Sequence, residues 1–143
     1  MEQTLLLVKP DAVERGFSGA ILGRFESAGL TLVGLKMLQM DQSLAEHHYA
    51  PHKEKPFFKG LISYITSGPI VAAVFEGEDA VKVARTVMGA TDPAKAGPGS
   101  IRKDFGMDIE RNAVHGSDSV KTAEQEVTLF FKSSEIQSYK RKQ

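Results

Sequence analysis

A histidine at position 115 lies in the stretch NAVHGSDS, between a short apolar pair and a run of small hydroxyl and acidic residues. An imidazole nitrogen is a nucleophile near neutral pH, and the contact made by the other ring nitrogen fixes its tautomer. Gly116 leaves space for a ligand beside the ring, Ser117 and Asp118 offer polar partners, and the start of the next helix offers backbone donors to an anion. His115 is therefore a candidate nucleophile; the alternative is an imidazole that only ends a strand.

Three cationic side chains lie beside predicted turns. Lys9 ends the first predicted strand, Arg85 lies on the helix after the third strand, and Arg102 lies in a long loop. The ends of strands can converge in space, so these charges can meet His115 and form an anion-binding site. For Arg85 the alternative is a stem that covers apolar surface while the guanidinium stays in water.

Glu126 flanks the apolar face of the last predicted helix, because it follows Ala123 by three residues and precedes Phe130 by four. A carboxylate there can reach beneath the last strand and accept a proton from one nitrogen of His115, which leaves the other nitrogen free to attack. The alternative is an ordinary solvated helix face. The sequence also leaves open whether Glu126 acts directly or through Ser117.

The stretch from 47 to 58 contains two further candidates. Phe57 and its neighbour Phe58 are typical core residues, but one of two adjacent aromatics near a break faces outward, where a phenyl ring can stack on any nucleobase. His48 and His52 have the spacing of two metal ligands on a helix, but the proline between them disrupts the helix and no third ligand is apparent. We therefore expect no metal ion held by protein side chains.

The composition excludes several classes of protein. A chain of 143 residues with 41% hydrophobic and 25% charged residues is typical of a single globular domain spanning 1–143. Eighteen basic residues balance eighteen acidic ones, so we expect no specific nucleic-acid partner. The absence of cysteine excludes disulfides, thiolate zinc sites and thiol catalysis. No apolar run matches a signal peptide or a membrane span, so we expect a cytoplasmic protein without a membrane partner.

Alternating strand and helix patterns must position these residues. Apolar runs predict strands over 3–9, 30–40, 68–77 and 111–116, and helical spacing predicts helices over 18–29, 43–50, 56–66, 78–89 and 119–131. The buried faces should include Ile21, Leu22, Phe25, Ala28, Ala80, Ala84, Val87, Met88, Val120, Ala123, Val127 and Phe130. Residues 90–110 are predicted to be a long functional loop. The order favours the α+β class, as a ferredoxin-like βαββαβ sandwich with helices packed on a four-stranded antiparallel sheet.

Seven longer stretches carry a resemblance to a known family: VKPDAVERG, GRFESAGL, LVGLKM, HYAPHKEKPFFKGL, SGPIVA, MGATDPAKAGPGSIRKDF and NAVHGSDS. Over nearly its full length, the chain resembles nucleoside diphosphate kinases. The resemblance implies reversible ping-pong transfer of the γ-phosphoryl group from a nucleoside triphosphate, mainly ATP, to a nucleoside diphosphate through a phosphohistidine at His115. It also implies broad base tolerance and Mg²⁺ as cofactor, carried on the nucleotide phosphates.

The resemblance further implies a role for each candidate residue. The residues implied to bind the phosphates are Lys9, Arg85, Thr91 and Arg102. The residues implied to contact the ribose hydroxyls are Lys9 and Asn112. The base is implied to stack on Phe57, with Leu61 near it. The residues implied to support the histidine are Tyr49 beside the ring and Ser117 and Glu126 in hydrogen bonds around it.

The implied partners are nucleoside tri- and diphosphates and further copies of the chain. Family members form hexamers or tetramers, and TDPAKAGPG resembles the loop that packs around the threefold axis of hexamers, so a homo-hexamer is favoured. A nucleic-acid module would instead show a basic stripe interleaved with aromatics, which this neutral chain does not show clearly. A nucleotide sensor would keep Lys9, Arg85 and Arg102 but would not need His115.

Overall fold

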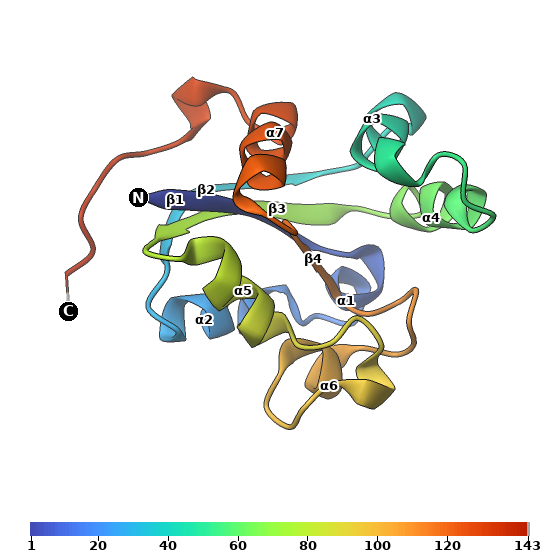
Figure 1. The fold of residues 1–143 in the computed structure, drawn as a ribbon, viewed down its shortest axis with the longest axis horizontal. Coiled ribbons are helices and arrows are strands. Elements are labelled where there is room, and N and C mark those ends of the chain that lie inside the picture. Colours follow the sequence, from blue (N-terminus) through green and yellow to red (C-terminus); the bar gives the residue numbers. More distant parts are fainter. Residues whose placement is uncertain (143) are drawn as a thin grey trace.

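The computed structural model describes residues 1–142 and contains a four-stranded antiparallel sheet in the order β2-β3-β1-β4 (Figure 1). The strands are β1 (Glu2–Val8), β2 (Thr31–Leu38), β3 (Ile70–Gly77) and β4 (Val114–Gly116). In the β1–β4 pair, Leu7 lies opposite His115. This arrangement confirms the predicted ferredoxin-like α+β fold, and the strand pairing supplies the order that periodicity left open.

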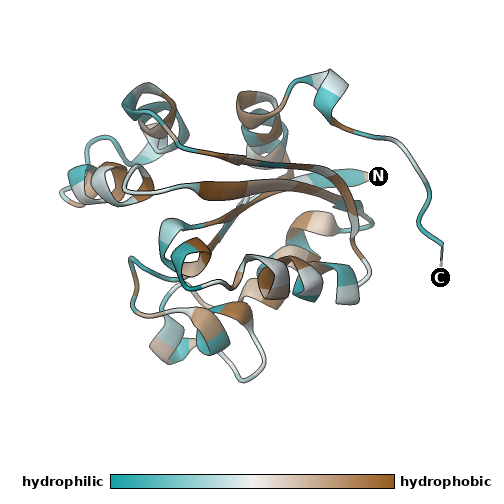
Figure 2. Ribbon diagram, turned by 180° about the vertical axis from the view of Figure 1, so that it is seen from behind, coloured by the Kyte–Doolittle hydropathy of each residue, from teal (hydrophilic) through white to brown (hydrophobic). Residues whose placement is uncertain are grey.

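Helices cover both faces of the sheet (Figure 1). One face carries α1 (Pro10–Glu14), α2 (Ser18–Ser27), α5 (Ala80–Met88) and α6 (Ile101–Phe105). The other face carries α3 (Gln42–His48), α4 (Phe58–Ile65) and α7 (Val120–Phe130). A strand covered on both faces needs apolar side chains at successive positions, which explains the continuous apolar run of β3, visible as a brown strand in Figure 2.

Two apolar clusters hold these layers together, and β1 contributes to both because successive side chains of a strand point to opposite faces. Leu6 and Val8 pack under α2 and α5, whereas Leu5 and Leu7 pack under α4 and α7. The first helix after β1 was not predicted. It is a single short turn of five residues that begins at Pro10, too short to show an apolar period.

Residues 90–110, predicted to be a long loop, contain two short regular elements. A 3₁₀ turn spans Pro93–Lys95, and α6 begins after Ser100, whose side chain accepts a hydrogen bond from the backbone N–H of Lys103. Both elements are too short to show an apolar period. The sequence indicates them only through their N-capping residues, Asp92 and Ser100. The segment packs against the core through Ile101 and Phe105.

Two residues predicted to be buried are exposed. Val120 is 46% exposed because it is the first residue of α7, and Ala28 is exposed because it follows the last turn of α2. Both lie on the predicted apolar face of their helix but at its end, where that face extends beyond the elements that cover it. The central residues of both stripes, Phe25 and Val127, are buried.

The packing of the 90–110 segment predicts a strong effect at Gly106. A Cβ atom there would lie 2.5 Å from the carbonyl oxygen of Arg102 and 2.6 Å from Cγ of Pro93. We expect Gly106→Ala to lower the free energy of unfolding by about 1–3 kcal/mol in urea denaturation, because the backbone must shift. Gly97→Ala is the matched control, since a Cβ there meets no atom within 4 Å. Equal stabilities of the two variants would contradict the packing described for this segment.

Candidate functional site

A cavity of about 620 Å³ lies where the ends of β1 and β4 meet the helices of both layers. Ten of the residues predicted for the site line it: Lys9, Tyr49, Phe57, Leu61, Arg85, Thr91, Arg102, Asn112, His115 and Glu126. The remaining predicted residue, Ser117, is buried behind the cavity. The volume suits a ligand of nucleotide size.

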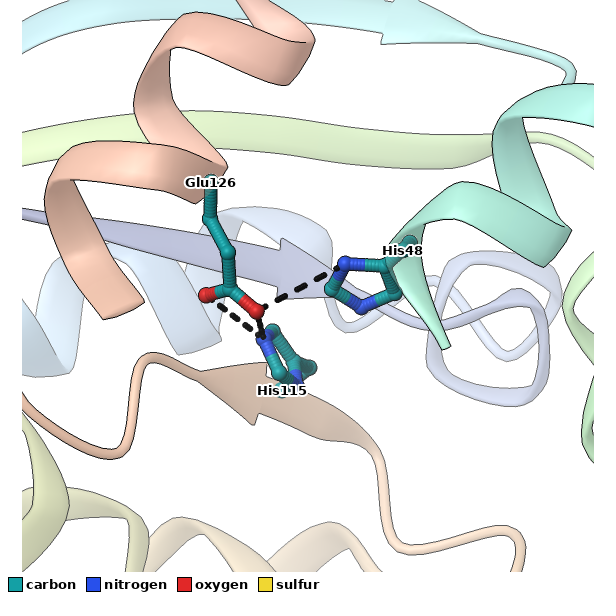
Figure 3. Close-up of side chains that lie close together, drawn as sticks. All are labelled: His48, His115 and Glu126. Atoms are coloured by element: carbon teal, nitrogen blue, oxygen red, sulfur yellow. Dashed lines mark hydrogen bonds and ion pairs between the residues drawn. The ribbon is translucent and has the colours of Figure 1, made fainter. Parts of the chain in front are cut away.

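His115 and Glu126 are in direct contact (Figure 3). Nε2 of His115, on β4, lies 3.2 Å from each carboxylate oxygen of Glu126, on α7. Ser117 donates a 2.6 Å hydrogen bond to Oε1 of Glu126, and its own oxygen accepts from the backbone N–H of Leu5. The structure thus answers the question left by the sequence: Glu126 contacts the imidazole itself, and Ser117 holds Glu126.

The electrostatics of this pair favour an ionised carboxylate. Burial raises the pKa of Glu126, but the hydrogen bond and charge of His115 and the hydrogen bond from Ser117 outweigh burial, so the pKa lies below its usual value. An ionised carboxylate can only accept a hydrogen bond, so Nε2 must carry a proton that it donates to Glu126. Whenever the ring is neutral, its lone pair is therefore on the other nitrogen, Nδ1.

His48 packs beside this pair, which the sequence did not predict. Its ring meets the ring of His115 edge-on at a centroid distance of 4.5 Å, and its Nδ1 lies 3.6 Å from Oε2 of Glu126. Burial and the charge of His115 lower the pKa of His48 to about 3, so its ring is neutral. No sequence spacing joins residues from α3, β4 and α7. His52, which has the spacing of a second ligand to His48 but was not expected to bind a metal, does not belong to this cluster.

The ring of His48 lies between the rings of Tyr49 and His115. Its ring packs against the rings of His48, at 4.7 Å, and His52, at 6.4 Å. Burial raises the pKa of its hydroxyl, so Tyr49 stays neutral.

Lys9, Asn112 and Thr91 form a chain of hydrogen bonds across the cavity wall. Nζ of Lys9 donates to the side-chain oxygen of Asn112 at 2.8 Å, and the amide nitrogen of Asn112 donates to the carbonyl of Thr91 at 2.9 Å. Burial and the nearby charge of Arg102 lower the pKa of Lys9 to about 8. The lysine is therefore a buried cation whose direct partner is a neutral amide, and its charge remains available to an anion.

Arg102 ties the 90–110 segment to the strand that carries His115. Its guanidinium donates to the carbonyls of Gly89, at 3.1 Å, and Val114, at 2.9 Å. Burial and the charge of Arg85 lower its pKa to about 10, which leaves it protonated near neutral pH. Because Val114 directly precedes His115, this arginine positions the strand in addition to supplying charge.

Arg85 is the most exposed of the three cations. Its side chain is 43% exposed and forms a 2.7 Å ion pair with Asp118, which is itself largely exposed. The guanidinium thus lies at the rim of the cavity, where water can replace the Asp118 contact. An exposed pair of this kind contributes little stability, so an anion can take its place at small cost.

The two adjacent phenylalanines face opposite ways. Phe57 is 50% exposed and lines the cavity with its ring near His52, whereas Phe58 packs against the core. Leu61, on α4, is half-buried and lies beside this apolar wall. An exposed ring at a cavity mouth can stack on a flat ligand.

Gly116 lines the cavity beside His115 and also serves the packing under β4. A Cβ atom there would lie 2.6 Å from the side chain of Met88 and 3.5 Å from that of Leu6. The missing side chain therefore makes room for core packing under β4, which the sequence did not predict.

The Glu126 contact predicts the tautomer of His115. In the unligated protein at neutral pH, we expect the neutral ring of His115 to carry its proton on Nε2, because only that nitrogen faces the carboxylate. Nuclear magnetic resonance of ¹⁵N-labelled histidine distinguishes the two tautomers. In Glu126→Gln the preference should weaken, while the exposed His47 gives an internal reference. A proton on Nδ1 in the unchanged protein would contradict the assignment.

Comparisons with known proteins agree with this geometry. The family model described as "Nucleoside diphosphate kinase" matches residues 2–136. A nucleoside diphosphate kinase from Dehalococcoides mccartyi is 63% identical over 142 residues, which are 99% of this chain and 100% of the relative. None of the helices within residues 1–142 has the length and apolar character to cross a bilayer.

Two solved structures of similar proteins match the whole fold. A nucleoside diphosphate kinase from Halobacterium salinarum, described in complex with CDP, matches with a TM-score of 0.95 at 48% identity, over 98% of this chain and 93% of that one. The enzyme from Aquifex aeolicus matches with a TM-score of 0.92 at 46% identity, over 94% of this chain and 98% of that one. The chain therefore belongs to the nucleoside diphosphate kinase family, and it is a nucleotide-binding phosphotransferase.

Proposed function

We propose that the chain transfers the γ-phosphoryl group of a nucleoside triphosphate to a nucleoside diphosphate through a phosphohistidine at Nδ1 of His115. The observation that carries this proposal is the contact between Nε2 and Glu126, which leaves Nδ1 on the cavity side. In the first half-reaction, Nδ1 attacks the γ-phosphorus and the bond to the β-phosphate oxygen breaks. In the second, a terminal oxygen of the incoming diphosphate attacks the same phosphorus and Nδ1 leaves. The reaction is reversible because the two half-reactions are alike.

Glu126 is the positioning residue of this mechanism. As Nδ1 bonds to phosphorus, positive charge grows on the ring, and a carboxylate at 3.2 Å from Nε2 stabilises that charge. The Nε2 proton stays on the ring throughout, so no proton has to leave during phosphoryl transfer. Ser117 fixes the carboxylate, and Tyr49 supports the ring from the far side of His48.

The phosphates are proposed to bind Lys9, Arg85, Thr91 and Arg102. Two of the cations are buried without a carboxylate in direct contact, and Arg85 exchanges Asp118 for a phosphate at the rim. Charges in a partly desolvated site stabilise a phosphoryl group more than they do in water. The Mg²⁺ ion belongs to the substrate. It would be held by the nucleotide phosphates and would neutralise part of their charge. The side chains proposed to bind the phosphates, Lys9, Arg85 and Arg102, are cations and offer no oxygen ligands of the kind that Mg²⁺ prefers.

The nucleoside is proposed to lie between Phe57 and the wall formed by Lys9 and Asn112. Stacking on an exposed ring does not read the base edge, which supports broad base tolerance. ATP is proposed as the main donor from the family resemblance. The relative from Halobacterium salinarum is described in complex with CDP, which supports nucleotide binding in the corresponding cavity. Leu61 extends the apolar contact, and the Lys9–Asn112 pair offers polar atoms to the ribose hydroxyls.

The chain is proposed to form one domain over 1–143 and to assemble as a homo-hexamer. The family model covers residues 2–136, which supports one domain. The segment TDPAKAGPG, whose resemblance favours the hexamer, contains the capped turn Pro93–Lys95. The lack of cysteine suits a reducing compartment and supports a cytoplasmic location.

Label transfer tests the nucleophile. We expect the protein to acquire ³²P from [γ-³²P]ATP and to pass it to an added nucleoside diphosphate such as GDP, because the intermediate is covalent. His115→Ala should lose both steps, since the nucleophilic nitrogen is gone. His47→Ala, which changes an exposed histidine, is the matched control and should keep both. Transfer by His115→Ala with a stable labelled protein would assign the nucleophile to another residue.

The lowered pKa of Lys9 predicts a pH dependence of nucleotide binding. The free protein carries the Lys9 charge below pH 8 and loses it as the pH rises through about 8. Between pH 7 and 9.5 we expect the dissociation constant of a nucleoside diphosphate to rise about tenfold, because a charge-assisted hydrogen bond to phosphate weakens. Fluorescence or calorimetric titration measures this change. Lys9→Arg keeps its charge and should give a flatter profile; identical profiles would refute the assignment.

A further inference from the structure

A cluster of potential metal ligands lies beneath the proposed nucleophile. One nitrogen each of His48 and His115 and one carboxylate oxygen of Glu126 all lie within 4.8 Å of one another (Figure 3). The three side chains come from α3, β4 and α7, so the cluster depends on the tertiary fold. Two imidazoles and one carboxylate are the protein ligands of a common class of zinc site.

The distances within this cluster are close to those of a zinc site. With bonds of about 2.0–2.1 Å, two ligand atoms of a tetrahedral zinc ion lie about 3.3 Å apart. Here Nε2 of His115 lies 3.2 Å from Glu126, and Nδ1 of His48 lies 3.6 Å from it. The third pair, the two imidazole nitrogens, lies within 4.8 Å, so the rings would have to turn toward the ion to bring all three atoms to bonding distance. All three residues line the cavity, from which water can supply a fourth ligand.

His48 supplies an independent observation that points to a ligand. Its residue is only 7% exposed, and neither ring nitrogen has a hydrogen-bond partner among the described residues. A buried imidazole without a partner is unusual and costs free energy, and a metal ion at Nδ1 would satisfy it. Ser117 already holds Glu126, as residues around a metal site hold the ligands themselves.

We propose that His48, His115 and Glu126 form an inhibitory binding site for Zn²⁺. Nitrogen ligands favour zinc over Mg²⁺, which prefers oxygen, so the ion does not compete with the metal on the nucleotide. Zn²⁺ takes the lone pair of Nε2, so the proton that Nε2 carried moves through solvent to Nδ1. The ring stays neutral, but Nδ1 then has no lone pair with which to attack phosphorus. The inhibition rests on the proposed function of His115, whereas the binding does not.

Titration of the full chain with Co²⁺, a coloured substitute for zinc, tests the binding. We expect the intense visible absorption of tetrahedral Co²⁺ at one ion per chain, its loss when Zn²⁺ is added, and no change with excess Mg²⁺. His48→Phe keeps an aromatic ring but removes the ligand, and should weaken binding more than tenfold. The exposed His47→Phe is the matched control and should bind as the unchanged chain does.

A second variant tests the site if His48→Phe does not fold. Ser117→Ala leaves all three ligands in place but frees Glu126, and should weaken Co²⁺ binding about 10–100-fold. Only octahedral Co²⁺ in the unchanged chain, or full affinity in a folded His48→Phe, would overturn the proposed site.

Phosphoryl transfer measured with and without Zn²⁺ separates this proposal from the proposed function. With Mg²⁺ in excess and a zinc-selective chelator present, the unchanged chain should be active. With Mg²⁺ but no chelator, stoichiometric Zn²⁺ should lower the rate at least tenfold until the chelator is added again. Activity that is insensitive to bound Zn²⁺ would overturn the inhibition alone. A lack of activity even with chelator, together with normal Co²⁺ binding, would overturn the proposed function and leave the metal site standing.

Discussion

The contact between the Glu126 carboxylate and Nε2 of His115 is the interaction on which the site depends. It joins α7 to β4 and makes the two ring nitrogens of His115 unequal. The apolar face of α7 makes this contact possible, because Val127 and Phe130 pack on the sheet and hold the helix over β1. A buried carboxylate also needs partners, and Ser117 and His115 supply them. Core packing and chemistry are therefore set by the same helix.

A second constraint on the structure is the burial of two cations, Lys9 and Arg102, without an anionic partner in direct contact. Lys9 and Arg102 donate hydrogen bonds to an amide and to backbone carbonyls, which are neutral, so their charge is not cancelled by direct contact. Burial lowers both pKa values, and so does a neighbouring charge: that of Arg102 on Lys9 and that of Arg85 on Arg102. Each lowered pKa is a cost in folding stability. A bound polyphosphate would remove this cost. Arg85, at the exposed rim, forms an ion pair with Asp118 that is easily exchanged.

The segment from 90 to 110 shows where sequence reasoning was weakest. Its helix and its 3₁₀ turn are three to five residues long, so no apolar period can develop. The caps at Asp92 and Ser100 were the available signal. The double hydrogen bond of Arg102 to Gly89 and Val114 could not be predicted, because it forms only after the segment folds back onto β4.

The sequence by itself determined the order of most strands and helices, the two-sided burial of the central strands, and the residue types at the site. The strands, helices and their burial follow from the periodic spacing of apolar residues, and the site residues lie in short motifs that the sequence shows directly. Only the tertiary structure decided that Glu126 contacts His115 directly, that His48 packs edge-on beneath it, and that Gly116 makes room for Met88. Such contacts join elements that are distant in sequence, and their geometry comes from how the helices dock on the sheet, which no local pattern records.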